Sequence, residues 1–138
     1  MRADELLRKY GNAADSSEVR RYNRVMANLV SRTHNSRTGQ TIYVFQCSSV
    51  SGKYGGHQVT LVTHNNTIRV ACDCPEYKYF AEYNATSGDY NWGSREGRPL
   101  KRNAFHNVPC CHHIAKALLE LQTYIDNRSF SSMRVRFR

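Results

Sequence analysis

Long apolar segments are absent from this sequence, and acidic residues are few. No run of about 18 apolar residues exists, which excludes a membrane-spanning helix. The first residues, MRADELLRKY, lack the apolar centre of a signal peptide. We therefore expect an intracellular, cytoplasmic protein that is neither secreted nor in contact with a membrane.

The shortage of acidic residues leaves the chain strongly basic. Twenty Lys and Arg residues stand against eleven Asp and Glu, which gives a formal net charge of +9 at pH 7. Such a charge favours a polyanionic partner, either nucleic acid or an acidic protein surface. The hydrophobic share of 40% and the charged share of 22% are ordinary for a folded protein, and 138 residues suit one compact domain.

The cysteines are odd in number and occur in clusters. Secreted disulfide frameworks use even sets of cysteines, and the spacing here differs from such a framework. Metal binding is therefore the leading explanation for the clustered cysteines. The five are Cys47, Cys72, Cys74, Cys110 and Cys111.

Hydrophobic periodicity predicts helices in the N-terminal part of the chain. The stretch ADELLRKYGN predicts a short helix that ends at Gly11. A second helix is expected over residues 16–33, where Asp15 and Glu18 have the spacing of a capping box and apolar residues recur at helical intervals. The side chains expected to dock this helix on the core are Tyr22, Met26 and Leu29.

β-branched and aromatic residues predict a sheet in the middle of the chain. Three such stretches, TIYVFQCSSV, HQVTLVT and TIRVACDC, are separated by the turn-prone segments SGKYGG and HNN. This pattern predicts a three-stranded antiparallel meander over residues 40–72. A final amphipathic helix is expected to begin near Cys111.

Two short motifs supply residues that bind metals. Cys72 and Cys74 flank one residue at the end of a predicted strand, so both side chains point to the same face. Cys111 and His113 form a second pair where a helix begins. Because residues two apart in a helix are separated by about 200°, Cys111 must lie just outside the helix and His113 in its first turn. The positive helix end also helps to deprotonate the thiol.

Three thiolates and one imidazole are the ligand set of a closed structural zinc site. Four protein ligands leave no open position for water, so we expect one structural Zn²⁺, no catalysis and no small-molecule substrate. A remote alternative is a cysteine-dependent enzyme with His112 or His113 as the base, although no glycine-rich oxyanion site accompanies these residues. The doubled CCHH also allows Cys110 and His112 as alternative metal ligands.

The sequence resembles the SWIM zinc finger over about residues 40–120. The matching segments are CDCPEY at 72–77 and CHHIAKAL at 111–118, and GGHQVTLVTHNNTIRVA takes the place of the family's preceding hairpin. The family pattern of histidine followed by an apolar helix favours Cys111 with His113 as ligands. The resemblance implies DNA binding or protein interaction. The insertion between the two motifs is longer than in most members, which makes it a candidate for the specific function.

The chain is also similar to small SWIM-like proteins of tailed bacteriophages, some of which are virion components. This resemblance rests on the CxCP motif, the aromatic residues that follow it and the long glycine-containing insertion. It implies a protein of the host cytoplasm that can be incorporated in a virion. In the virion, basic segments of the chain would hold neighbouring subunits or packaged genome.

These features together predict an α+β fold. It consists of a small antiparallel β-meander with a zinc knuckle, packed against a C-terminal helix, plus N-terminal helices. We divide the chain into an N-terminal helical segment (1–36), a SWIM-like zinc-binding domain (37–126) with a long insertion (75–109), and a basic C-terminal tail (127–138).

Basic and aromatic residues outside the two motifs form the expected contact surface, because aromatics can stack on bases while cations neutralise phosphates. The predicted function is a non-enzymatic, zinc-stabilised module that contacts nucleic acid. The alternative is a phage virion structural or assembly protein that acts through protein–protein contacts. The expected contact residues are Arg20, Arg21, Arg24, Trp92, Arg95, Arg98, Lys101, Arg102, Arg134, Arg136 and Arg138.

Overall fold

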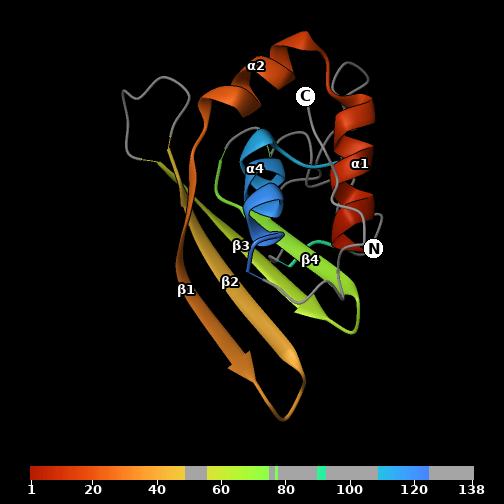
Figure 1. Ribbon diagram of the computed structural model, residues 1–138, viewed down its shortest axis with the longest axis vertical. Helices are drawn as coiled ribbons and strands as arrows, with labels where there is room; N and C mark the ends of the chain where they lie inside the picture. Colours follow the sequence, from red (N-terminus) through yellow and green to blue (C-terminus); the bar gives the residue numbers. More distant parts are fainter. Residues whose placement is uncertain (49–55, 75–76, 78–89, 93–108, 125–138) are drawn as a thin grey trace, which may run out of the picture.

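The computed structural model describes residues 1–48, 56–74, 77, 90–92 and 109–124 of the chain. Within these residues the chain has three helices and four strands (Figure 1). The helices are α1 (Ala3–Ala13), α2 (Ser16–Arg24) and α4 (His112–Leu121), and the strands are β1 (Ala27–Asn35), β2 (Gln40–Cys47), β3 (His57–His64) and β4 (Thr67–Cys72).

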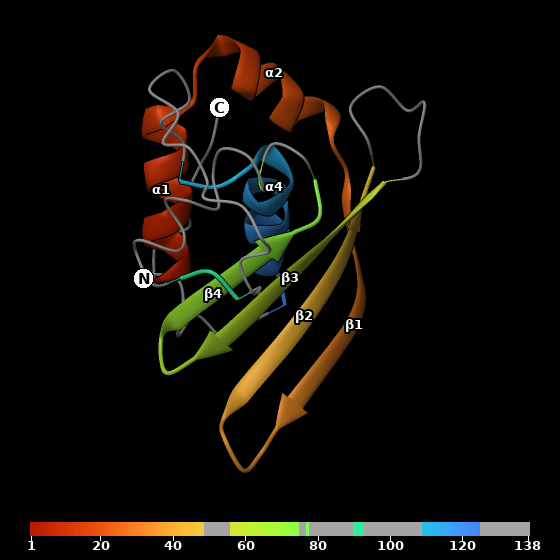
Figure 2. The same cartoon turned by 180° about the vertical axis from the view of Figure 1, so that it is seen from behind.

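The four strands form one antiparallel sheet in the order β1-β2-β3-β4, so each strand pairs with its neighbour in the chain. Helix α4 contacts all four strands, and α1 and α2 pack on α4. Figure 2 shows the opposite face of the sheet, which no helix of the described residues covers. The predicted α+β fold, with a meander packed against the C-terminal helix, is confirmed.

The predicted second helix is too long, and the predicted sheet is one strand short. Helix α2 ends at Arg24, and β1 follows it as a fourth strand that pairs with β2. Met26, expected in the core, is 67% exposed. The segment contains Asn, Val, Ser and Thr, which are poor helix formers, and pairing with β2 satisfies its backbone groups. Helix α1 in turn continues past Gly11 to Ala13.

Asp15 caps α2, because its carboxylate accepts a hydrogen bond from the backbone N–H of Glu18 at 2.8 Å. The Glu18 side chain turns inward, where it is 1% exposed and accepts a hydrogen bond from the Tyr10 hydroxyl at 2.8 Å. Nδ1 of His112 lies 3.9 Å from the same carboxylate oxygen. One buried carboxylate therefore links α1, α2 and the start of α4.

The β3–β4 hairpin has the tight turn that the HNN segment predicts. Asn65 and Asn66 have φ angles of 49° and 66°, as the two central residues of a type I′ turn require. Asparagine tolerates this left-handed conformation better than most residues. The turn sets the register His64↔Thr67, which carries the alternating buried residues of β4 toward Cys72.

The core lies between the sheet and α4. Burial alternates along β2 and β4, so one face of each strand packs under the helices. Each large apolar side chain buried there contributes roughly 1.5–3 kcal/mol. The fully buried core side chains include Leu6, Leu7, Tyr10, Phe45, Val59, Leu61, Val70, Ile114, Leu118 and Leu121.

Most of the insertion and the whole of the tail lie outside the described residues. Residues 90–92 lie alongside β4, where the Val70 N–H donates to the Tyr90 carbonyl at 2.7 Å and the Trp92 N–H donates to the Val70 carbonyl at 2.8 Å. The insertion is thereby anchored to the edge of the sheet. None of the helices in the described part of the chain has the length and apolar character needed to span a membrane.

Candidate metal centre

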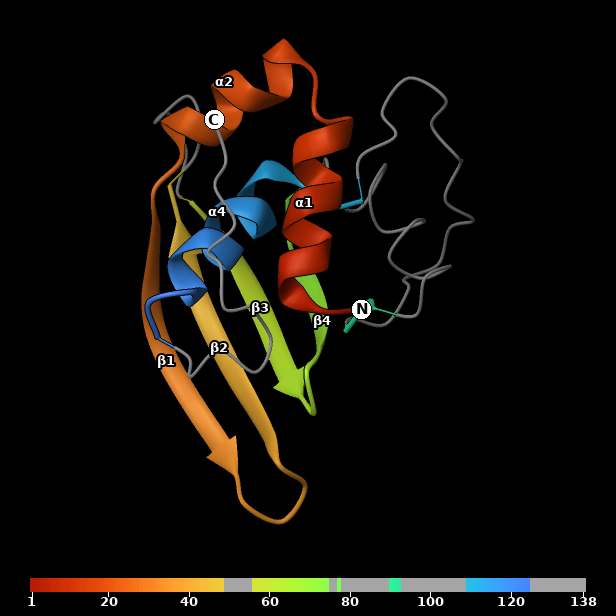
Figure 3. The ribbon, with the colours of Figure 1, turned by 45° about the vertical axis from the view of Figure 1, so that its right-hand side comes forward.

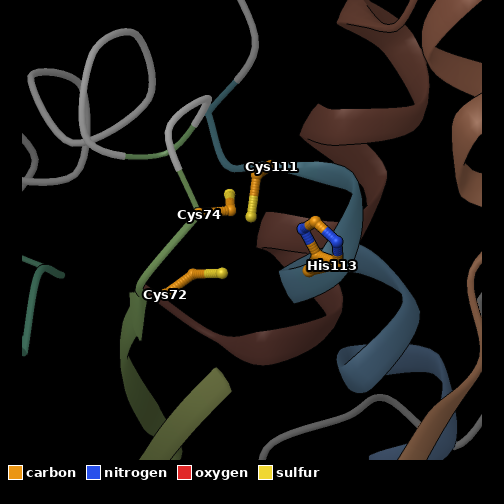
Figure 4. A group of neighbouring side chains, drawn as sticks. All are labelled: Cys72, Cys74, Cys111 and His113. Atoms are coloured by element: carbon orange, nitrogen blue, oxygen red, sulfur yellow. The ribbon is translucent and has the colours of Figure 1, made fainter. Parts of the chain in front are cut away.

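Four side chains meet where the sheet approaches α4. The sulfurs of Cys72, Cys74 and Cys111 and a ring nitrogen of His113 all lie within 4.8 Å of one another (Figure 4). All four residues are buried, with Cys111 fully enclosed and Cys72 6% exposed. The two halves of the cluster come from residues far apart in the chain, and the sheet and helix packing brings them together.

The Cys72–Cys74 knuckle is fixed by the residue between the two cysteines. The Asp73 carboxylate accepts a hydrogen bond from the Gln58 N–H at 3.0 Å and lies 3.2 Å from Nδ1 of His57. The Asp73 N–H also donates to the Gln58 carbonyl at 3.3 Å. Because these contacts hold Asp73 against β3, the cysteines on either side both face the cluster.

Cys111 and His113 converge in the way that the helix start requires. Cys111 is the N-cap residue of α4, with extended backbone angles (φ −79°, ψ 166°), and its side chain makes no capping hydrogen bond. Its sulfur instead points into the cluster (Figure 4). His113 is the second residue of α4, so it lies in the first turn and reaches the same point.

The thiols of the cluster share their protons unequally. The pKa of Cys74 is held well below its ordinary value, first by the hydrogen bond from the Cys111 thiol and then by that from Cys72. Burial raises the pKa of both Cys72 and Cys111 well above the ordinary value. Without a cation, one thiolate is therefore stabilised and further negative charge is opposed. A divalent cation would offset that cost and allow all three sulfurs to ionise.

The residues present fit a metal ion. Both ring nitrogens of His113 are buried, and neither has a hydrogen-bond partner among the described residues. Buried polar atoms are almost always satisfied, so a nitrogen in this position suits a metal ligand. The backbone N–H of Tyr77 donates to the Cys74 sulfur at 3.3 Å, as expected for a ligand that carries negative charge. The Cys3His group can hold one metal ion.

The alternative pair is not part of this group. Cys110 is fully buried, but its sulfur does not belong to the set that lies within 4.8 Å. His112 faces α2, where Nδ1 lies 3.9 Å from the Glu18 carboxylate. The geometry therefore joins Cys111 and His113, not Cys110 and His112, to the two cysteines after β4.

Two residues that lie beside the cluster were not predicted from the sequence. The ring of His57 lies edge-on to that of His113, with the ring centroids 4.8 Å apart. The buried Cys47 donates from its sulfur to the His113 carbonyl at 3.8 Å. The pairing Cys47↔His57 at the ends of β2 and β3 places both there. Only the strand register indicates that these two residues lie beside the cluster, because neither has a partner at motif spacing in the sequence.

The expected contact residues are only partly described. Arg20 and Arg24 are exposed on α2, whereas Arg21 lies 3.4 Å from the Glu18 carboxylate. Trp92 is 41% exposed beside β4. The remaining expected contact residues, in the insertion and the tail, lie outside the described residues: Arg95, Arg98, Lys101, Arg102, Arg134, Arg136 and Arg138.

No protein-family model matches this chain, and neither curated proteins nor solved structures give a match. The cluster is compatible with a zinc finger. The specific resemblance to the SWIM finger stays a prediction that rests on the two motifs and their convergence.

Proposed function

We propose that this protein is a non-enzymatic module, stabilised by one structural zinc ion, that binds nucleic acid through its basic surface. The observation that carries the proposal is the buried Cys3His group formed by Cys72, Cys74, Cys111 and His113. It joins the end of the sheet to the beginning of α4.

Zinc is the metal that this ligand set favours. Soft thiolates with one imidazole, in a closed tetrahedral arrangement, are typical of structural zinc sites. Because the protein supplies four ligands and buries them, no coordination position is left for a water or a substrate. The metal then serves to hold β4 and α4 together.

Charge supports nucleic acid as the partner. The net charge is +9, and Arg20 and Arg24 are exposed on α2. Trp92 offers an exposed aromatic ring beside the sheet, suited to stacking on a base. The arginines and lysines of the insertion and the tail add further cations along the chain.

Elemental analysis and a salt titration test the proposal together. Purified protein should contain one equivalent of zinc, and its affinity for DNA should fall by orders of magnitude between about 50 and 200 mM salt. Charge-neutral glutamine variants at Arg20 and Arg24 should reduce the slope of that dependence. Protein without a bound transition metal would overturn the metal assignment. Failure to bind nucleic acid, together with tight stoichiometric capture of one protein, would favour the assembly role instead.

A further inference from the structure

The sheet is free of acidic residues. Between Glu18 and Asp73 the sequence contains no Asp or Glu but has seven Lys and Arg residues. This segment includes the last part of α2 and all four strands. Because the strands themselves contribute no carboxylates, their sequence adds no negative charge that would repel a polyanion.

One part of the sheet projects beyond the core. The β1–β2 hairpin extends past the end of the β3–β4 hairpin (Figures 1 and 3). Residues 31–39 are all exposed, and residue 40 is half-buried. We call residues 31–40 the arm. Its sequence, SRTHNSRTGQ, contains only polar residues and glycine, so it has no apolar face to bury against the protein.

Short-range contacts hold the arm in one shape. The guanidinium of Arg32 lies over the Tyr43 ring, 5.8 Å from its centroid. Nδ1 of His34 is 2.8 Å from the Thr41 hydroxyl on the partner strand. At the tip, the Asn35 carboxamide oxygen accepts from the Arg37 N–H at 3.0 Å. Arg37 therefore extends from a fixed turn at the end of a paired two-stranded ribbon.

Gly39 closes that turn. Its φ of +77° lies in the left-handed region, and its N–H donates to the Asn35 carbonyl at 2.8 Å. The turn thus keeps both strands of the arm in register up to the tip. A rigid ribbon loses little conformational entropy when it binds, which favours recognition over simple charge attraction.

We propose that the arm is a DNA-binding ribbon that enters the major groove of a duplex, an inference that rests on the proposed function of binding nucleic acid. The major groove of B-form DNA admits a two-stranded β-ribbon. Arg32 and Arg37 supply cations for phosphates or for the O6 and N7 acceptors of guanine. The hydroxyl and amide side chains between them offer both donors and acceptors to base edges.

The shape of the arm also predicts that it binds a DNA duplex in preference to an RNA duplex. The major groove of an A-form RNA helix is deep and narrow, so a protein ribbon cannot reach the bases there. Double-stranded DNA is therefore the expected ligand class, and an RNA duplex of the same sequence is expected to bind only through general charge attraction.

The experiment compares the full chain with the double variant Arg32→Gln/Arg37→Gln. The matched control is Arg8→Gln/Lys9→Gln on α1, which removes the same charge from side chains that lie near Asp4 and Glu5. Binding of a DNA duplex, and of an RNA duplex with the same sequence, is measured as a function of salt. Methylation of guanine N7 by dimethyl sulfate, with and without protein, reports on the major groove directly.

The arm variant should bind duplex DNA at least about tenfold more weakly than the unchanged chain, with a salt slope smaller by about 2. It should also lose the N7 protection that the unchanged chain gives, while the control keeps it. The unchanged chain should prefer the DNA duplex to the RNA duplex.

Three outcomes distinguish failure of the proposed function from failure of the proposal for the arm. If the unchanged chain binds no nucleic acid at low salt, the proposed function itself fails. If it binds DNA but the arm variant binds equally well, the arm is not the contact and the proposed function stands. If the unchanged chain binds DNA without protecting N7, the arm does not enter the major groove and the proposed function again stands. Retained zinc content and an unchanged unfolding midpoint show that the variant is folded.

Discussion

The two ends of the same sheet differ in nearly every physical respect. At one end, which we call the metal end, Cys47, Cys72 and Cys74 lie buried beneath the start of α4. At the other end, the arm is exposed along its length and carries arginines without nearby carboxylates in its own sequence. Strand β2 connects the two, since it runs from Gln40 in the arm to Cys47 at the metal end.

Because of this difference, we expect residues at the metal end to determine the stability of the fold and residues in the arm to determine binding. Groups at the metal end face one another, so their removal should cost folding free energy. Groups in the arm face solvent, so their removal should leave folding intact and alter binding alone. Variants at the two ends measure how far that separation holds.

Loss of the metal should have the largest effect. Cys111→Ser removes a ligand and should abolish stoichiometric zinc binding, whereas Cys110→Ala should retain one equivalent. Structural zinc sites in small peptides contribute about 10–16 kcal/mol, more than the usual stability of a domain this size. The Cys111→Ser protein should therefore lose amide protection in β4 and α4. Zinc content and hydrogen exchange measure both effects, and equal zinc loss in the two variants would contradict the ligand assignment.

Because the thiol of Cys47 is buried, the free energy of unfolding should fall as the pH becomes alkaline. Burial, and then the negative charges of Cys74 and Asp73, raise its pKa from 9.0 to about 12. Because the folded pKa lies above the unfolded one, the stabilisation is complete below pH 9 and is lost between pH 9 and about 12, at about 1.4 kcal/mol per unit. Cys47→Ala lacks this titration.

Denaturant unfolding at several pH values checks the prediction for Cys47. The difference in unfolding free energy between the unchanged chain and Cys47→Ala should shrink as the pH rises through this range. A difference that stays constant with pH would mean that the thiol ionises equally well in the folded protein.

Removal of the Glu18 carboxylate should have an intermediate effect. Glu18→Ala leaves the Tyr10 hydroxyl without its buried acceptor and should lower the free energy of unfolding by about 2 kcal/mol. Lys9→Ala is the control, because its contact with Glu5 at 3.8 Å is exposed and should matter by less than about 0.5 kcal/mol. Thermal or urea unfolding measures both variants. Similar losses would show that the Glu18 network adds little beyond a surface ion pair.

The arm should have the smallest effect on folding. Arg32→Gln removes the contact with the Tyr43 ring at an exposed site and should change the free energy of unfolding by less than about 0.5 kcal/mol. Urea unfolding of this variant beside Glu18→Ala compares the exposed arm with a buried carboxylate of the helical layer. A loss as large as that of Glu18→Ala would show that the arm takes part in the core.

Local patterns predicted the four residues of the Cys3His cluster, but not Cys47 and His57 beside it. The spacing of Cys72 and Cys74 requires only that side chains alternate along a strand, and Cys111 with His113 requires only a helix start. Both conditions depend on a few neighbouring residues. The type I′ turn at Asn65 and Asn66 was predictable for the same reason.

The segment that forms β1 was predicted to be helical because Leu29 in it continues the helical spacing of Tyr22 and Met26, which precede the strand. Tyr22, Met26 and Leu29 follow one another at helical spacing, yet only Tyr22 is fully buried among the three. The choice between helix and strand depended on whether β2 offered its edge for pairing, which is a contact between different segments. The inward turn of Glu18 likewise depended on Tyr10 and His112 from other helices.

The sequence by itself determined the ligand types, their pairwise spacing, the excess of positive charge and the α+β class, because each follows from composition or from residues close along the chain. The packing of α4 on the sheet decided which cysteine and which histidine join the cluster. It also decided that Cys47 and His57 lie beside the cluster and that the polar arm extends away from it. Those outcomes depend on strand register and on contacts between distant segments, which local periodicity does not encode.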